Sequence, residues 1–171
     1  VLSIDNMQII NRCSHPPEIT RDLSFQLAKA AVKIKLPGAW HYLVTTFFYP
    51  EVRKERTTLV PPILRPAILA ARREPGEHVL VYQTGQNNPG LVPFLQRLPH
   101  RFRVYGLGRE GEEGNVSLRA FSEQGFVDDL RTAKAAVAGG GFSLMSECVH
   151  LGVPLYSVPI DGQYEQELNA R

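Results

Sequence analysis

Three consecutive glycines at residues 139–141 precede Ser143 and Glu147, and together these residues could bind an anion. The apolar stretch at residues 135–138 predicts a strand, and the pattern after the glycines predicts a helix that begins near Ser143. A helix N-terminus carries free N–H groups and partial positive charge, and glycines let a phosphate approach them. Glu147, one turn further on, suits the two adjacent hydroxyls of a ribose. The spacing therefore fits a nucleotide, but a glycine turn with Ser143 as a plain N-cap explains it equally well.

A second glycine pattern, GLGREG at residues 106–111, satisfies the G-x-G-x-x-G spacing of dinucleotide-binding loops. It follows a predicted strand, and Asp128 and Asp129 lie about twenty positions further on, as that fingerprint requires. The third glycine should, however, open a helix that receives the pyrophosphate. Here residues 112–118 read as a loop and then a strand. We therefore interpret the pattern as a surface turn rather than an NAD site.

Predicted strands and helices alternate regularly from residue 77 onward. Strands are expected at 78–83, 101–106, 115–121, 134–140 and 154–159, and helices at 88–99, 126–133, 143–152 and 163–171. This alternation predicts βαβ units and a parallel sheet with helices on both faces. Ligands bind such sheets beyond the carboxyl ends of the strands, so the loops that follow the strands are the ones to inspect.

The first part of the chain shows a different organisation. Residues 1–5 read as a short strand, residues 16–36 as a helix, and the aromatic, β-branched residues 40–49 as a core strand. The apolar positions that define the expected buried face of the helix are Leu23, Leu27, Ala30, Ala31 and Ile34. Residues 51–76 are rich in charge and proline and are the candidate linker between two domains. An irregular loop inside one domain explains that composition as well.

Composition narrows the class of protein. The 171 residues carry a net charge of +2 with both signs interspersed, which argues against a nucleic-acid-binding groove. The two cysteines lie far apart and form no disulfide framework, so we expect a reduced, cytoplasmic setting. No apolar run approaches the ~20 residues of a transmembrane helix. No carboxylates or histidines stand at metal-ligand spacing, so no metal site is predicted.

The residues 139–170, GGGFSLMSECVHLGVPLYSVPIDGQYEQELNA, resemble the donor-binding segment of GT-B glycosyltransferases. The resemblance extends upstream to GFVDDLRTAKAAVAGGG (125–141) and to HVLVYQTG (78–85), and is closest to UDP-glycosyltransferases and the lipid-II-forming N-acetylglucosaminyltransferases. It implies a GT-B type α/β fold. Residues 77–171 would be a Rossmann-like nucleotide-sugar domain, truncated at its end, and residues 1–50 the last part of a preceding α/β domain on the acceptor side.

The resemblance also implies a role for individual residues. The donor diphosphate would be held by Gly140, Gly141, Phe142 and Ser143, together with Thr84, Gly85 and Gln86 after the first strand of the donor domain. Glu147 would bind the ribose, Phe126 and Val127 the base, and Glu165, Gln166 and Asn169 the donor sugar. The sequence departs from the family pattern at Gly139, where many relatives have histidine, at Leu144, where many have Ser or Thr, and at Glu165, where aspartate is usual.

The expected activity is therefore transfer of a sugar from a nucleotide diphosphate, UDP in the first instance, to a hydroxyl acceptor such as a lipid or a cell-envelope glycan. No cofactor or metal is expected, because helix and backbone donors stabilise the leaving diphosphate. The catalytic base stays unassigned, and the fragment alone is expected to be inactive. Peripheral attachment at the inner face of a membrane would follow from residues 40–54 if they form an interfacial patch. Two alternatives are a UDP-sugar 2-epimerase and a non-catalytic nucleotide-binding domain.

Overall fold

The computed structural model describes residues 1–35, 37–83, 88–160 and 162–171, and the chain divides into two compact units. Unit 1 comprises residues 1–63, 161–169 and 171, and unit 2 comprises residues 64–160 and 170. The boundary falls inside the stretch predicted as a linker. That stretch contains strand β3 (Thr57–Val60) and helix α4 (Pro66–Ala70), neither of which the sequence pattern predicted.

Unit 1 is built on a three-stranded parallel sheet in the order β1-β2-β3, with β1 at Leu2–Ile4 and β2 at His41–Thr45. Its helices are α1 (Gln8–Arg12), α2 (Pro17–Thr20), α3 (Leu23–Lys35) and α8 (Tyr164–Ala170). The shared core contains residues from α1, α3, β2 and α8, among them Ile9, Phe25, Val44 and Tyr164. The long N-terminal helix expected from sequence is thus two helices, and residues 41–45 form the predicted core strand.

The apolar face predicted for α3 is not the face that packs into this core. Phe25 and Val32 are buried, whereas Leu23, Leu27 and Ile34 are 73%, 64% and 78% exposed. Phe25 and Val32 lie seven residues apart, which places them on one side of the helix, roughly opposite the predicted stripe. The prediction was wrong because an apolar stripe marks a candidate contact surface without saying which neighbouring element covers it.

Unit 2 contains a six-stranded sheet in the order β6-β7-β5-β4-β8-β9. Its strands are β4 (His78–Tyr82), β5 (Arg101–Tyr105), β6 (Gly111–Glu113), β7 (Val116–Arg119), β8 (Ala135–Ala138) and β9 (Leu155–Ser157). All neighbours are parallel except β6, which pairs antiparallel with β7. The predicted parallel sheet is confirmed. Strand β6 was not predicted, because its three residues are too few to show an alternating pattern.

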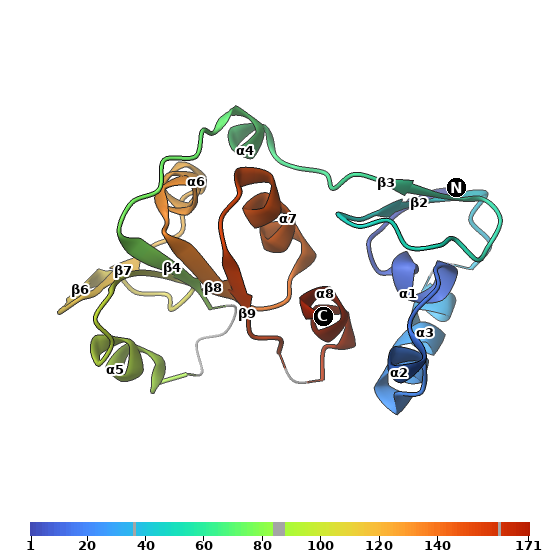
Figure 1. Cartoon of the computed structure of the whole chain (residues 1–171), viewed down its shortest axis with the longest axis horizontal. Helices are drawn as coiled ribbons and strands as arrows, with labels where there is room; N and C mark the ends of the chain where they lie inside the picture. Colours follow the sequence, from blue (N-terminus) through green and yellow to red (C-terminus); the bar gives the residue numbers. More distant parts are fainter. Residues whose placement is uncertain (36, 84–87, 161) are drawn as a thin grey trace. The chain divides into compact units, whose positions relative to one another are not determined.

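Helices cover both faces of this sheet, as Figure 1 shows. On one face, α4, α6 (Glu123–Thr132) and α7 (Phe142–Leu151) share a core with Leu80 and Tyr105. On the other face, α5 (Leu91–Gln96) packs on Val81, Phe102 and Val104. Alternate residues of one strand therefore enter different cores, which is why β4 reads as a continuous apolar run. In the part of the chain that the structure describes, no helix is both long and apolar enough to cross a bilayer.

Candidate functional site

The glycine turn leads from β8 into α7 at the carboxyl edge of the unit 2 sheet. α7 begins at Phe142 with Gly141 as its N-cap, and no side chain caps it, so Ser143 does not act as the plain N-cap. Gly141 has φ −67°, and a Cβ added there would meet no atom of the described residues within 4 Å. Gly141 and Ser143 are also exposed. The fold itself therefore does not require glycine at position 141, and the space beside the helix N-terminus is open to a ligand.

A cavity of about 400 Å³ lies beside this turn. It is lined by residues at the carboxyl ends of β4, β8 and β9, including Tyr82, Gln83, Ala138, Gly139 and Pro159. This is the edge at which open parallel sheets bind ligands, and the volume is within the range of small-molecule sites. The turn and the cavity together form the candidate donor site.

Glu147 lies in the second turn of α7, and its carboxylate is paired with Arg65. The Arg65 Nε and Nη2 atoms donate to the Glu147 Oε1 and Oε2 atoms at 2.8 and 2.9 Å. Hydrogen bonding to Glu147 raises the pKa of Arg65 above its usual value, although burial acts to lower it. Arg65 also lies 3.7 Å from Glu123 and 5.6 Å above the ring of Phe126. A carboxylate has about four acceptor positions, of which Arg65 occupies two in Glu147, and the Glu147 side chain is only 8% exposed.

Sequence reasoning missed Arg65, which lies 82 positions before its partner. It follows two prolines and an apolar pair in a stretch without periodicity, so no local pattern marks it. The available signal was indirect. A glutamate on a helix predicted to pack into the core needs a cationic partner, and Arg65 could have been considered for that reason.

Phe126 and Val127 lie within α6, and the two residues are 3% and 2% exposed. Phe126 makes edge contacts with Tyr82 and Tyr105, at 5.6 and 5.1 Å between ring centroids. Side chains buried in this way cannot stack on a base without opening the core. Binding of the base through backbone groups of these two residues, the other form of the prediction, stays a prediction. Phe121, which precedes α6, is 61% exposed.

The remaining predicted donor-site residues fall into two groups. Thr84, Gly85 and Gln86 lie outside the described residues. Glu165, Gln166 and Asn169 belong to α8, which packs into the core of unit 1 through Tyr164 and Leu168. Unit 2 thus contains the predicted diphosphate and ribose residues Gly140, Gly141, Phe142, Ser143 and Glu147, whereas unit 1 contains the predicted sugar-binding residues.

The GLGREG pattern forms no nucleotide-binding loop in the structure. Gly106 has φ +92°, and a Cβ there would lie 1.8 Å from the Gln83 carbonyl oxygen. Gly111 opens strand β6 rather than a helix. The interpretation as a turn is confirmed, and Gly106 is glycine because the backbone leaves no room for a side chain.

A parallel sheet with helices on both faces and a glycine turn at its carboxyl edge defines a doubly wound α/β unit, a class that binds ligands at this edge. The sequence matches glycosyl transferase family 1 over residues 1–171, and the chain belongs to that family. No curated protein matches it.

Two solved glycosyltransferase structures are similar to the chain. The glycotransferase of kitacinnamycin has a TM-score of 0.53 and 20% identity, and the match covers 90% of this chain and 50% of that one. Glycosyltransferase SnogD from Streptomyces nogalater has a TM-score of 0.46 and 18% identity, with 85% and 47% covered. The chain therefore spans about half the length of each. The parallel α/β sheets agree with the GT-B fold predicted from sequence.

Proposed function

We propose that the chain is part of a glycosyltransferase that binds a UDP-sugar and transfers the sugar to a hydroxyl acceptor without a metal ion. In this reaction the acceptor oxygen bonds to the anomeric carbon while the bond from that carbon to the diphosphate oxygen breaks. The acceptor proton is released, and UDP leaves. The membership of glycosyl transferase family 1 supports sugar transfer, and the resemblance to UDP-dependent enzymes supports the choice of nucleotide.

The observation that carries the proposal is the open space at Gly141. Neither its backbone angles nor its packing call for glycine, yet it stands at the N-cap of a ten-residue helix beside a cavity. A diphosphate that contacts the backbone N–H groups there explains the glycine. The same groups and the helix dipole would stabilise the charge that develops on the leaving diphosphate.

The test is calorimetric titration of UDP into the protein and into its Gly141→Ala variant. Since the fold has room for the methyl group, we expect an unchanged unfolding temperature. The methyl group would occupy the space that the phosphate needs, and we expect UDP binding to weaken by about tenfold, equivalent to ~1.4 kcal/mol. Unchanged UDP binding in Gly141→Ala would show that the glycine serves the turn alone.

Two further variants on α7 complete the experiment. Glu147→Gln removes the ribose-binding charge and should weaken UDP by about tenfold or more. His150→Ala is the matched control, because His150 is exposed on the same helix and faces no predicted ligand group. Titration of NAD into the parent protein tests whether the GLGREG pattern at residues 106–111 binds a dinucleotide. Absence of UDP binding in a well-folded protein would argue against the donor site.

A further inference from the structure

A cavity of about 970 Å³ lies at the amino edge of the unit 2 sheet, the edge opposite the glycine turn. It is lined by the first residues of β4 and β5 and by the turn before β7, including His78, Arg101 and Asn115. The candidate donor cavity is instead lined by the carboxyl ends of β4, β8 and β9. The two cavities share no lining residue, so ligands of each can be tested separately.

Polar residues of three adjacent strands line this cavity from one face of the sheet. Arg101 and Arg103 are two residues apart in β5, so their side chains point to the same side. Ser117 of β7 pairs in register with Arg103, and Arg119 follows two positions later. Glu112 of β6 pairs in register with Ser117 and completes the row. The arginines therefore occupy the middle of this face.

The three arginines differ in what they contact. Arg103 pairs with the Asp129 carboxylate, whose Oδ2 atom also accepts the Tyr105 hydroxyl at 2.7 Å. This pairing holds Arg103 in place and balances its charge. Arg101 and Arg119 are exposed, and neither forms an ion pair with a residue that the structure describes. Two guanidinium groups in one cavity are thus available to an anion.

The positive charge acts on the interior of this edge as well. His78 is buried, and its Nε2 atom contacts the Asp129 carbonyl oxygen at 2.8 Å. Burial lowers the pKa of His78 most, the contact with Asp129 opposes this, and the charges of Arg103 and Arg119 lower it further. Arg119 therefore affects a buried group although it is itself exposed, as expected of a positive charge without an acidic partner.

Acidic side chains flank the arginines at both ends of the cavity. Glu112 of β6 lies at one end and accepts the Ser117 hydroxyl at 2.6 Å. Glu77, the residue before β4, lines the opposite end, because β4 lies on the other side of β5 in the sheet. These carboxylates would repel a ligand that is negatively charged throughout, but they can accept hydrogen bonds from hydroxyl groups. The arrangement fits a molecule with one anionic group and several hydroxyls.

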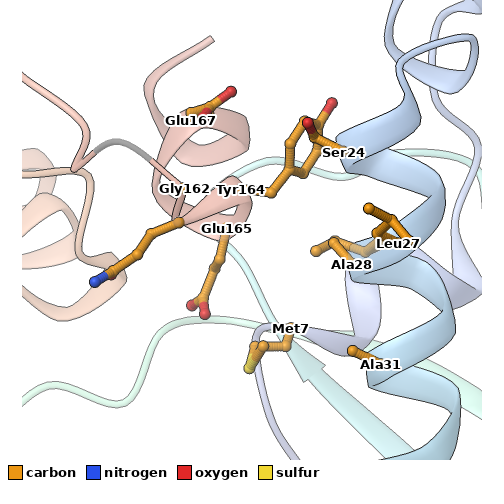
Figure 2. Close-up of a pocket in the computed structure, with 11 residues that line it drawn as sticks. Met7, Ser24, Leu27, Ala28, Ala31, Gly162, Tyr164, Glu165 and Glu167 are labelled. Carbon is orange, nitrogen blue, oxygen red and sulfur yellow. The ribbon is translucent and has the colours of Figure 1, made fainter.

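The cavity of unit 1 has a different character. Figure 2 shows its apolar side chains, Met7 and Leu27 among them, together with Glu165 and Glu167 of α8. None of the described residues that line it is positively charged. An anion is therefore expected to avoid that cavity and to bind in unit 2.

We propose that the cavity at the amino edge of unit 2 binds a sugar phosphate, with the phosphate held by Arg101 and Arg119 and the sugar hydroxyls donating to Glu77 and Glu112. Two guanidinium groups favour a phosphate monoester, which carries close to two charges at neutral pH, over a sugar carboxylate with one. The volume is within the range of small-molecule sites. The inference goes beyond the proposed function and does not depend on it.

The test is calorimetric titration of glucose 6-phosphate, inorganic phosphate and glucose into the full chain, at constant ionic strength and with UDP present to occupy the donor site. We expect glucose 6-phosphate to bind at least about tenfold more tightly than inorganic phosphate, because only the sugar can donate to the glutamates. Glucose without a phosphate should show no binding. Equal affinities for glucose 6-phosphate and inorganic phosphate, or no binding of glucose 6-phosphate, would overturn the proposal.

Arginine variants locate the phosphate. Arg101→Gln and Arg119→Gln should each weaken glucose 6-phosphate binding by about tenfold. Arg97→Gln is the matched control, because Arg97 is also exposed, forms no ion pair with a described residue and lies outside the cavity. Thermal unfolding should be unchanged in all three variants. An equal effect of Arg97→Gln would show that the probe responds only to the overall charge of the protein, and the assignment would be wrong.

Glu112→Gln tests the contact with the sugar. This change removes a charge that repels phosphate and replaces a strong hydrogen-bond acceptor with a weaker one. Inorganic phosphate should therefore bind more tightly, and the preference for glucose 6-phosphate over inorganic phosphate should fall by about threefold or more. An unchanged preference would contradict the role given to Glu112.

UDP titrations separate this site from the donor site. Arg119→Gln should bind UDP as the parent protein does, and Gly141→Ala should bind glucose 6-phosphate as the parent does, because the two residues lie at opposite edges of the sheet. Displacement of glucose 6-phosphate by UDP would assign the probe to the donor site and overturn this proposal alone. If UDP does not bind, the donor proposal fails, and the effects of Arg101→Gln and Arg119→Gln still decide whether the sugar-phosphate site exists.

Discussion

At the scale of single residues, the pair formed by Arg65 and Glu147 connects the stretch before unit 2's sheet to the predicted donor helix. The Glu147 side chain is 8% exposed and that of Arg65 is 27% exposed. Removing the arginine leaves a buried carboxylate without its partner. We expect Arg65→Gln to lower the free energy of unfolding by about 2–3 kcal/mol, less than for a fully buried pair because solvent reaches the arginine. Chemical denaturation monitored by circular dichroism measures this.

The control for Arg65→Gln is Arg109→Gln. Arg109 pairs with Glu113 at 2.7 Å, but both side chains are largely exposed, at 56% and 36%. Exposed pairs contribute little to stability, so this variant should unfold almost as the parent protein does. The double variant Arg65→Gln with Glu147→Gln should recover part of the loss, because it removes the unpaired charge. Equal free energies of unfolding for Arg65→Gln and Arg109→Gln would contradict a stabilising role of the Arg65–Glu147 pair.

How far the candidate site could be predicted from sequence depends on how far apart its residues lie in the chain. Gly141, Ser143 and Glu147 fall within seven positions, so one strand-turn-helix pattern placed them together. Arg65 could not be found in this way, because its contact with Glu147 depends on the tertiary fold. The burial of Phe126 depends on three aromatic neighbours from other elements, which no local pattern specifies.

At the scale of elements, the turn after β5 depends on a close approach to the end of β4. Gly106 has φ +92°, and the Gln83 carbonyl oxygen would lie 1.8 Å from an added Cβ. The methyl group of Gly106→Ala must displace that backbone, and we expect a loss of at least about 3 kcal/mol in stability. Gly114 provides the comparison, since it has φ +64° but open space around its Cβ position. Gly114→Ala should cost about 1–2 kcal/mol, from the backbone angle alone.

These two glycine variants can be compared by thermal unfolding in the same buffer. A similar loss in both would mean that the backbone angle, rather than the approach to Gln83, decides the effect. The comparison also shows why the G-x-G-x-x-G spacing can be met without a nucleotide site. Glycine at position 106 is required by a neighbouring strand, and a sequence pattern does not distinguish that requirement from contact with a ligand.

Elements with a clear periodicity of apolar residues were predicted well, and short elements were not. The alternation from residue 77 predicted five parallel strands of unit 2, of which β4, β5 and β8 contribute residues to both cores. Helix α1, strand β3 and strand β6 contain five, four and three residues, too few for a period to appear. The predicted packing face of α3 was wrong for another reason. Both sides of this helix carry large apolar residues, and only the tertiary structure decides which side is covered.

At the scale of the whole molecule, the buried His78 and the half-buried His15 make stability depend on pH. His78 is buried and contacts the Asp129 carbonyl oxygen at 2.8 Å, and His15 contacts the Ile9 carbonyl oxygen at 3.0 Å. Burial is the main cause that lowers the pKa of both. In the unfolded chain both would take up a proton near their usual pKa of about 6.5. Below that pH the unfolded state therefore binds more protons than the folded state.

The free energy of unfolding should consequently fall as the pH is lowered from 7 to 5, until the folded-state pKa values are reached. The double variant His15→Gln with His78→Gln keeps an N–H donor at both positions but cannot titrate. Its stability should change less over the same interval, as measured by urea denaturation at pH 7, 6 and 5. Glu165, whose pKa is raised, contributes in the opposite direction at the acid end, but equally in both proteins. Parallel pH profiles would show that other groups govern acid unfolding.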